Sequence, residues 1–318
     1  MTTALVFPGQ GSQAVGMGKA LAENFPAAAE VFARVDAALG ETLSRVIFEG
    51  PEAELTLTAN AQPALMATSL AALRALESEA GLDVARDAAF VAGHSLGEYS
   101  ALCAAGALTL DDAARLLRIR GRAMQKAVPV GEGAMAAILG LDFSEVSEIA
   151  AQAARDLFPT GAVCEAANDN GGGQVAISGT KAAVERAIEL AKLKGAKRAL
   201  PLPVSAPFHC SLMRPAAQAM AEALETTTIR PPKVPLVANV SARAVTDPAV
   251  IRDNLVAQVT GTVRWRESVL TMRASGVTRF VELGAGRVLA GLIKRIAEGA
   301  NASSVGTPAD VAAFKAAD

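Results

Sequence analysis

The chain has 318 residues, of which 51% are hydrophobic and 19% charged, a composition that excludes an intrinsically disordered protein. Its 30 Lys and Arg residues nearly balance 32 Asp and Glu residues, so no net field recruits nucleic acid or an anionic membrane. The apolar residues lack an uninterrupted run of about 18, and the 3 cysteines form no CxxC pair. We therefore expect a reduced, cytoplasmic protein without a membrane span.

Short apolar strands alternate with helical segments along most of the chain. Residues 4–7 form an apolar run that ends at Pro8-Gly9, and residues 88–92 are typical of a buried strand. This alternation predicts an α/β core with a mostly parallel sheet flanked by helices. The other elements expected in this core are helices over 20–25, 63–76, 98 onward and 111–126, and strands over 234–240 and 279–283.

The middle of the chain has a different order of elements. The β-α-β-β-α-β order found there is typical of a ferredoxin-like α+β subdomain. We therefore predict an inserted subdomain at 129–204 and a discontinuous core made of 1–128 and 205–318. The elements behind this prediction are strands over 133–140, 162–167, 174–178 and 197–204, and helices over 143–157 and 181–194.

Gly93-His94-Ser95-Leu96-Gly97 matches the GxSxG pattern and lies between the predicted strand at 88–92 and the helix that starts at 98. A nucleophile elbow requires this context, because a sharp turn places the serine hydroxyl at a strand end, facing a helix N-terminus. The flanking glycines allow neighbouring backbone to approach closely. The pattern predicts that Ser95 is a nucleophile on a hydrolase-like core, with an ordinary turn serine as the alternative.

A serine at its ordinary pKa needs a base, and the chain has only 2 histidines. His94 is adjacent to Ser95, and neighbouring side chains diverge on such a turn, so His209 is the remaining candidate. It lies in a proline-punctuated loop after a predicted strand, and the alternative is a histidine satisfied in the core. The aspartates that could complete a triad fall in the inserted subdomain. We therefore predict a dyad in which a backbone carbonyl or an amide side chain holds His209.

The helix predicted over 111–126 carries a basic side chain among its apolar residues. At about 100° per residue, Arg120 falls on the apolar side and points inward, where an unpaired guanidinium costs several kcal/mol. It must meet either a structural Asp or Glu, which the helical wheel alone favours, or a substrate carboxylate gripped by two hydrogen bonds. The other cations share the opposite side and are interpreted as a solvated face: Arg115, Arg118, Arg122 and Lys126.

The glycine loop FPGQGSQ at 7–13 follows the first predicted strand. Its spacing fits neither GxGxxG nor GxxxxGK[ST], so nucleotide binding is rejected. Such a loop can offer backbone N–H groups or glutamine amides to an anion. It suits an oxyanion hole whose second donor is the backbone N–H of Leu96, the residue after the nucleophile. A glycine-rich turn without chemistry is equally compatible with the pattern.

Several motifs, taken in this order and spacing, carry a specific resemblance to a known family. They are FPGQGSQ at 7–13, GHSLGEYSAL at 93–102, RGRAMQ at 120–125, GAMAAILGL at 133–141, LPVSAPFHCSLM at 202–213, ANVSA at 238–242, AQVTGTVRW at 257–265 and VELGAGRVLAGL at 281–292. Over almost its whole length the chain resembles the malonyl-CoA:acyl-carrier-protein transacylases of bacterial fatty-acid synthesis.

The resemblance implies a role for each candidate site residue. Ser95 would be acylated, His209 would be its base, and the segment containing Gln258 would orient the histidine through a backbone carbonyl. The remaining implied roles are backbone donors to the oxyanion at Gln10 and Leu96, a partner for the malonyl carboxylate at Arg120, and malonyl selectivity at Phe208.

The resemblance also implies the substrates, malonyl-CoA and the phosphopantetheine thiol of acyl carrier protein, with no metal or redox cofactor. We expect a monomer that binds neither nucleic acid nor membrane. An acidic carrier would need a local basic face, for which the candidates are Lys192, Lys194, Lys197, Arg198, Lys294 and Arg295. From the residues alone, two rivals stay open: a serine hydrolase with the same elbow, and a non-catalytic module that binds the carrier.

Overall fold

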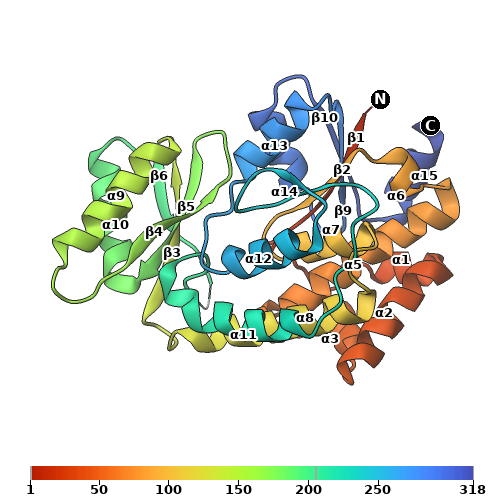
Figure 1. Ribbon diagram of the computed structural model, residues 1–318, viewed down its shortest axis with the longest axis horizontal. Coiled ribbons are helices and arrows are strands. Elements are labelled where there is room, and N and C mark those ends of the chain that lie inside the picture. The colour runs from red at the N-terminus through yellow and green to blue at the C-terminus, as the bar shows by residue number, and fades with distance from the viewer. Residues whose placement is uncertain (1, 205, 318) are drawn as a thin grey trace.

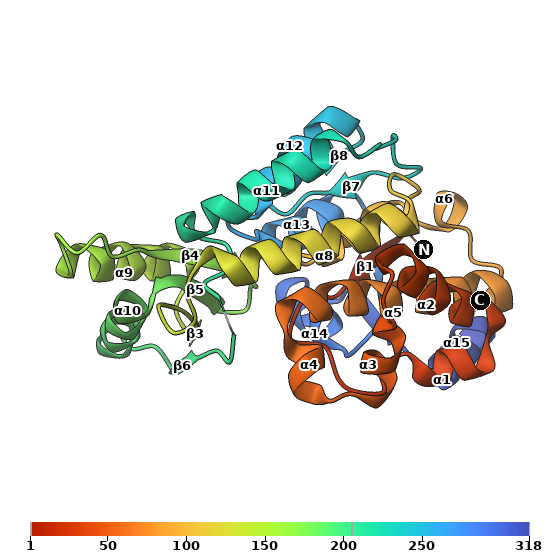
Figure 2. The same cartoon turned by 90° about the horizontal axis from the view of Figure 1, so that it is seen from below.

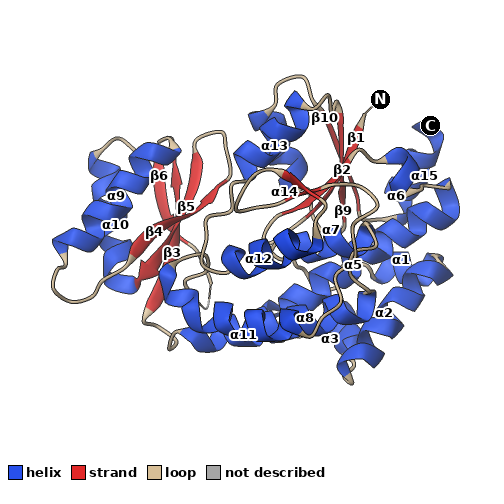
Figure 3. Cartoon of the chain, viewed as in Figure 1, coloured by secondary structure: helices blue, strands red, loops and turns tan. Residues whose placement is uncertain are grey.

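The computed structural model describes residues 2–204 and 206–317 as two sheets with helices around them (Figures 1 and 3). The larger sheet has six strands in the order β10-β9-β1-β2-β7-β8. Every pairing in it is parallel except β7 with β8. Its strands are β1 (Thr3–Phe7), β2 (Phe90–Gly93), β7 (Leu236–Val237), β8 (Ala244–Val245), β9 (Arg279–Leu283) and β10 (Asn301–Val305).

Helices cover both faces of this sheet, as the alternating side chains of β1 show. Leu5 and Phe7 pack into one apolar cluster, whereas Ala4 and Val6 pack into another on the opposite face. Helices α13 and α14 cover the second face. The helices of the larger unit are α1 (Lys19–Asn24), α2 (Pro26–Leu39), α3 (Leu43–Glu49), α4 (Glu52–Thr56), α5 (Thr58–Ala80), α6 (Val84–Asp87), α7 (Gly97–Ala104), α8 (Leu110–Ala127), α11 (Arg214–Glu225), α12 (Pro248–Gln258), α13 (Trp265–Ala274), α14 (Val288–Ile296) and α15 (Pro308–Ala317), with a 3₁₀ turn at Ser211–Met213.

The smaller sheet has the antiparallel order β4-β5-β3-β6. Its own apolar cluster lies between the sheet and two helices, and a capping box at Asp142 and Glu145 starts the first of them. This is the ferredoxin-like arrangement that the sequence predicted. Its elements are β3 (Gly133–Leu139), α9 (Phe143–Asp156), β4 (Cys164–Asp169), β5 (Gln174–Thr180), α10 (Lys181–Leu193) and β6 (Arg198–Pro201).

The mostly parallel sheet flanked by helices, together with the small antiparallel sheet, confirms the predicted fold class. The division into 1–128 with 205–318 and an insertion at 129–204 stays a prediction, and residue 205 itself lies outside the described residues. No helix in the described part of the chain is long and apolar enough to cross a bilayer.

Two predicted features are wrong. The strand expected over 234–240 is only Leu236–Val237, because the chain turns at Asn239, whose side chain bonds the loop after β2. The solvated face of α8 does not include Arg118, which is buried. Its guanidinium donates to the carbonyl of Ala59 and pairs with Glu41 at 2.9 Å. Figure 2 shows α8 running beside α2 and α5, which explains why two sides of this helix are covered.

Candidate active site

A strained turn joins β2 to α7 and carries Ser95. The φ angle of Ser95 is +54°, a region that non-glycine residues rarely adopt. A Cβ on Gly93 would lie 1.9 Å from the carbonyl carbon of Gly97, and one on Gly97 would lie 2.2 Å from the carbonyl oxygen of Phe7. Both flanking glycines are therefore required by close backbone approach, and the turn has the geometry of a nucleophile elbow.

Asn239, which follows β7, holds this turn from the side. Its Oδ1 accepts a 2.7 Å hydrogen bond from the backbone N–H of Ser95, and its Nδ2 donates to the carbonyl of Gly93 at 2.7 Å. The fully buried side chain of Asn239 therefore holds the backbone on both sides of the strained turn, at Gly93 and at Ser95.

His209 contacts the serine hydroxyl. Its Nε2 lies 2.8 Å from Ser95 Oγ, and its Nδ1 lies 2.9 Å from the backbone carbonyl oxygen of Gln258. A carbonyl only accepts, so Nδ1 carries the proton and Nε2 is free to accept one from the serine. Burial, and then the positive charge of Arg120, lower the pKa of His209 to about 3, so the imidazole is neutral at physiological pH.

Arg120 points inward from α8 and is 1% exposed. Its Nη2 lies 3.1 Å from Ser95 Oγ and 2.8 Å from Gln258 Oε1, and its Nη1 lies 2.8 Å from Gln62 Oε1. No carboxylate within the described residues forms a direct ion pair with it. The structural acid that the helical wheel favoured is present only indirectly, as the buried carboxyl of Glu98, which interacts with the charge of Arg120 and reaches it through the Gln258 amide. The guanidinium is held by neutral amides and keeps its capacity to bind an anion.

A buried carboxyl lies beneath the elbow at Glu98. Its Oε2 accepts from the backbone N–H of Asn239 and from Gln258 Nε2, both at 2.9 Å. Burial raises the pKa of Glu98 to about 7. Sequence reasoning assigned no role to Glu98, Asn239 or Gln62. Glu98 lies in the motif GHSLGEYSAL and Asn239 in the motif ANVSA. An acidic residue in the first helical turn after the nucleophile was the signal that could have identified Glu98.

These groups open into a hollow of about 530 Å³. Gln10, Leu96 and Phe208 line it together with the serine, the histidine and the arginine. The backbone N–H groups of Gln10 and Leu96 donate no hydrogen bond to any other described residue, which leaves both available to a bound oxyanion. The predicted site residues therefore lie together around this hollow. The backbone carbonyl of Gln258 faces His209, where the resemblance implied a carbonyl, and its side-chain amide faces Arg120.

His94 also borders the hollow but does not contact the serine hydroxyl. Its Nε2 lies 2.9 Å from Asn170 Oδ1, and its ring packs against Trp265 with centroids 5.8 Å apart. Its rejection as the base agrees with this geometry. Among the described residues, no group of three or more His, Cys, Asp or Glu side chains is arranged to hold a metal ion.

A model of the acyl transferase domain matches residues 4–312. The chain belongs to the acyl transferase family. It is 50% identical to a malonyl CoA-acyl carrier protein transacylase from Bacillus subtilis, over 92% of this chain and 90% of that protein.

Solved structures of this family are close to the fold described above. An acyl-carrier-protein S-malonyltransferase from Bartonella henselae is 56% identical, with a TM-score of 0.95 over 100% of this chain and 99% of that one. A malonyl-transacylase in complex with a type II PKS acyl-carrier protein is 42% identical, with a TM-score of 0.94 over 100% of both chains. An acyltransferase fold and an acyltransferase sequence therefore coincide in this chain.

Proposed function

We propose that this acyltransferase moves a malonyl group from malonyl-CoA to the phosphopantetheine thiol of an acyl carrier protein, through a malonyl ester on Ser95, and so supplies fatty-acid synthesis. The observation that carries the proposal is Arg120 Nη2, 3.1 Å from the hydroxyl that would be acylated. Relatives named for malonyl transfer to acyl carrier protein support the choice of both substrates.

In the first half-reaction, His209 Nε2 takes the proton of Ser95 as Oγ attacks the thioester carbonyl carbon. The backbone N–H groups of Gln10 and Leu96 stabilise the oxyanion that forms. When the C–S bond breaks, the proton passes from His209 to the CoA sulfur. In the second half, the carrier thiol gives its proton to His209 and attacks the ester, and Ser95 leaves and recovers the proton.

The length of the acyl group decides how Arg120 acts. In a malonyl ester, two C–C bonds of about 1.5 Å separate the ester carbon from the free carboxylate carbon. A guanidinium that already reaches the serine oxygen can therefore grip that carboxylate with paired hydrogen bonds. An acetyl group offers no such anion, so Arg120 favours the diacid. Phe208 lies on the wall of the same hollow and limits the size of the acyl group that fits there.

Malonyl-CoA labelling tests this function. The wild-type protein should gain one malonyl group on the peptide that contains Ser95, and holo acyl carrier protein should discharge it. Ser95→Ala should abolish the label, whereas Ser100→Ala, which changes a buried serine on α7, the helix after the elbow, should keep it. Stoichiometric labelling of Ser95→Ala would exclude Ser95 as the nucleophile. Discharge by water as fast as by the carrier would indicate a hydrolase, and no label at all would indicate a binding module.

We further propose that the protein acts as a cytoplasmic monomer without a metal or redox cofactor and binds neither nucleic acid nor membrane. The chemistry above supports the proposal that no metal or redox cofactor is needed, because every proton goes to His209 and every charge meets a backbone N–H or Arg120. The exposed basic residues predicted for the carrier remain candidates on α10, on β6, in the turn between them and at the end of α14.

A further inference from the structure

The amide of Gln258 lies between a buried cation and a buried carboxyl. Its Oε1 accepts from Arg120 Nη2 at 2.8 Å. Its Nε2 faces three acceptors: Glu98 Oε2 at 2.9 Å, the carbonyl oxygen of Ser95 at 3.0 Å and Asn239 Oδ1 at 3.3 Å. This distribution fixes which end of the amide faces the guanidinium.

The reverse orientation of that amide would disturb the site. Its NH₂ group would face Arg120, so two donors would oppose each other, and its oxygen would face three acceptors. The guanidinium would then lose one of the hydrogen bonds that hold it beside Ser95. Because the side chains of Gln258, Arg120, Glu98 and Asn239 are buried, water cannot replace the lost bonds at low cost.

Among the three acceptors, Glu98 makes the shortest contact with the amide. Its carboxyl does not cap its own helix. Glu98 lies in the first turn of α7, but its Oε2 bonds Asn239 and Gln258, which come from other segments. Its Oε1 is buried and has no hydrogen-bond partner among the described residues. The Glu98 side chain therefore holds the backbone of Asn239 and the amide of Gln258 in place.

We infer that Glu98 is a positioning residue for the selection of the acyl group: its Oε2 orients the Gln258 amide, and that amide sets the Arg120 guanidinium for a substrate carboxylate. The inference rests on the proposed malonyl transfer. What Glu98 supplies is an acceptor atom at a fixed place. Burial raises the pKa of its carboxyl to about 7, which agrees with a role that does not depend on a full negative charge.

Glu98 is less important for the geometry of the elbow than for the orientation of Arg120. Asn239 holds Ser95 and Gly93 through its own side chain, and the backbone N–H of Arg264 donates to the Asn239 carbonyl at 3.0 Å. Withdrawing the Glu98 acceptor should therefore change the orientation of the guanidinium more than the reactivity of the serine.

Two conservative variants separate acceptor position from charge. Glu98→Gln keeps an acceptor oxygen at the Oε2 position and removes the charge. Glu98→Asp keeps the charge but withdraws the carboxylate by one C–C bond, about 1.5 Å, which is too far for the 2.9 Å contact to survive. Ser100→Ala is the matched control, because its hydroxyl is buried on the same helix and has no hydrogen-bond partner among the described residues.

Two readouts are measured for each protein: the ratio of kcat/KM for malonyl-CoA to that for acetyl-CoA, and the rate at which a neutral fluorophosphonate labels Ser95. We expect Glu98→Asp to lower the ratio about tenfold while its labelling rate stays within about threefold of the wild-type rate. Glu98→Gln and Ser100→Ala should keep the wild-type ratio.

Three outcomes would overturn the inference. A wild-type ratio in Glu98→Asp would show that the acceptor is not needed. A loss in Glu98→Gln as large as that in Glu98→Asp would show that an acceptor oxygen at the Oε2 position does not suffice. A parallel fall of ratio and labelling would make Glu98 a support of the elbow only. If the wild-type protein itself transfers no malonyl group, the proposed function fails instead, and the same assay shows it.

Discussion

His209 is a base whose protonation is governed by burial. The imidazole is 4% exposed, and desolvation, followed by the charge of Arg120, lowers its pKa to about 3. The unfolded chain therefore binds a proton at this position between about pH 3 and pH 6.5, whereas the native protein does not. The free energy of unfolding must rise with pH through this window and fall as the solution is acidified.

The pH dependence of stability tests the state of His209. Between pH 7 and pH 5 the wild-type protein should lose about 2 kcal/mol more of its free energy of unfolding than His209→Gln loses, because the variant has no imidazole to protonate there. Urea denaturation at several pH values measures this difference. His94 is present in both proteins and cancels. Equal losses in the two proteins would mean that native His209 titrates near its ordinary pKa.

Arg120 should act on selectivity more than on reactivity. Arg120→Ala removes the proposed partner of the malonyl carboxylate, so the preference for malonyl-CoA over acetyl-CoA should fall on the order of 10–100-fold. Steady-state kinetics with both thioesters give this ratio. A loss that is equal for the two acyl groups would return the arginine to a structural role, in which it only fills the space beside Gln62 and Gln258.

At the scale of elements, the β2–turn–α7 unit depends on backbone contact. The helix begins at Gly97, against the end of β1, and this approach aims the serine hydroxyl into the hollow. Helix α8 brings Arg120 to the same place, while Arg118, two positions earlier, contacts the start of α5 on another side. Two buried faces on one helix allow one arginine to be structural and the other to face the site.

Substituting the elbow glycine should be costly. A Cβ at position 97 would lie 2.2 Å from the carbonyl oxygen of Phe7, so Gly97→Ala must displace β1 or α7 and should destabilise the protein by at least about 3 kcal/mol. Gly291→Ala is the control, because that glycine lies within α14 and a Cβ there meets nothing within 4 Å. The control should be stabilised by about 0.5–1 kcal/mol. Thermal unfolding of both variants measures these changes. A Gly97→Ala protein that melted at the wild-type temperature would contradict the expected clash with β1.

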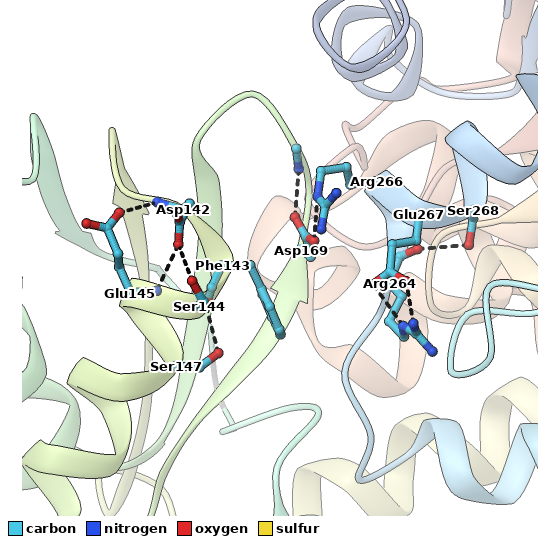
Figure 4. A network of polar contacts seen from close by, with 11 residues as sticks. Asp142, Phe143, Ser144, Glu145, Ser147, Asp169, Arg264, Arg266, Glu267 and Ser268 are labelled. Atoms are coloured by element: carbon cyan, nitrogen blue, oxygen red, sulfur yellow. Dashed lines mark hydrogen bonds and ion pairs between the residues drawn. The ribbon is translucent and has the colours of Figure 1, made fainter.

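At the scale of the whole molecule, the smaller sheet meets the larger unit along one side of β4, at the segment between α12 and α13. Asn168 forms a parallel bridge with Val263, and the backbone N–H of Asp169 donates to the Val263 carbonyl at 2.9 Å. The Asp169 carboxylate, with a side chain only 3% exposed, pairs with Arg266 Nε at 2.8 Å (Figure 4). The next residue, Asn170, reaches His94 beside the nucleophile. The smaller sheet is therefore connected directly to the wall of the site.

Removing Arg266 should loosen this junction. Arg266→Ala leaves the buried Asp169 carboxylate with the backbone N–H of Gly171 as its remaining partner, so the loss should be about 1–3 kcal/mol. Hydrogen exchange of the β4 amides should also become faster. Glu267→Gln, which breaks the half-buried pair with Arg264 at the N-cap of the same helix (Figure 4), should cost under about 1 kcal/mol. Unchanged exchange in Arg266→Ala would show that backbone bonds alone join β4 to the segment around Val263.

The sequence determined the features that depend on short-range geometry. Glycines two positions on either side of Ser95 specify a turn too tight for side chains, and helical periodicity places Arg120 on an apolar face. The ferredoxin-like order followed from the alternation of short elements. The strand over 234–240 was wrong because a long-range contact, from Asn239 to the elbow 144 positions away, competes with strand extension.

Tertiary structure decided which groups meet on those faces. Periodicity aims Arg120 inward but cannot say that its partners are Gln62 and Gln258, 58 and 138 positions away, or that no described carboxylate pairs with it. It also could not show that α5 and Glu41 bury Arg118. Local pattern fixes the direction of a side chain, whereas its electrostatic surroundings depend on the packing of distant segments. The sequence therefore identifies the residues that form the site of this acyltransferase. The selectivity of the site depends on how the folded chain orients those residues.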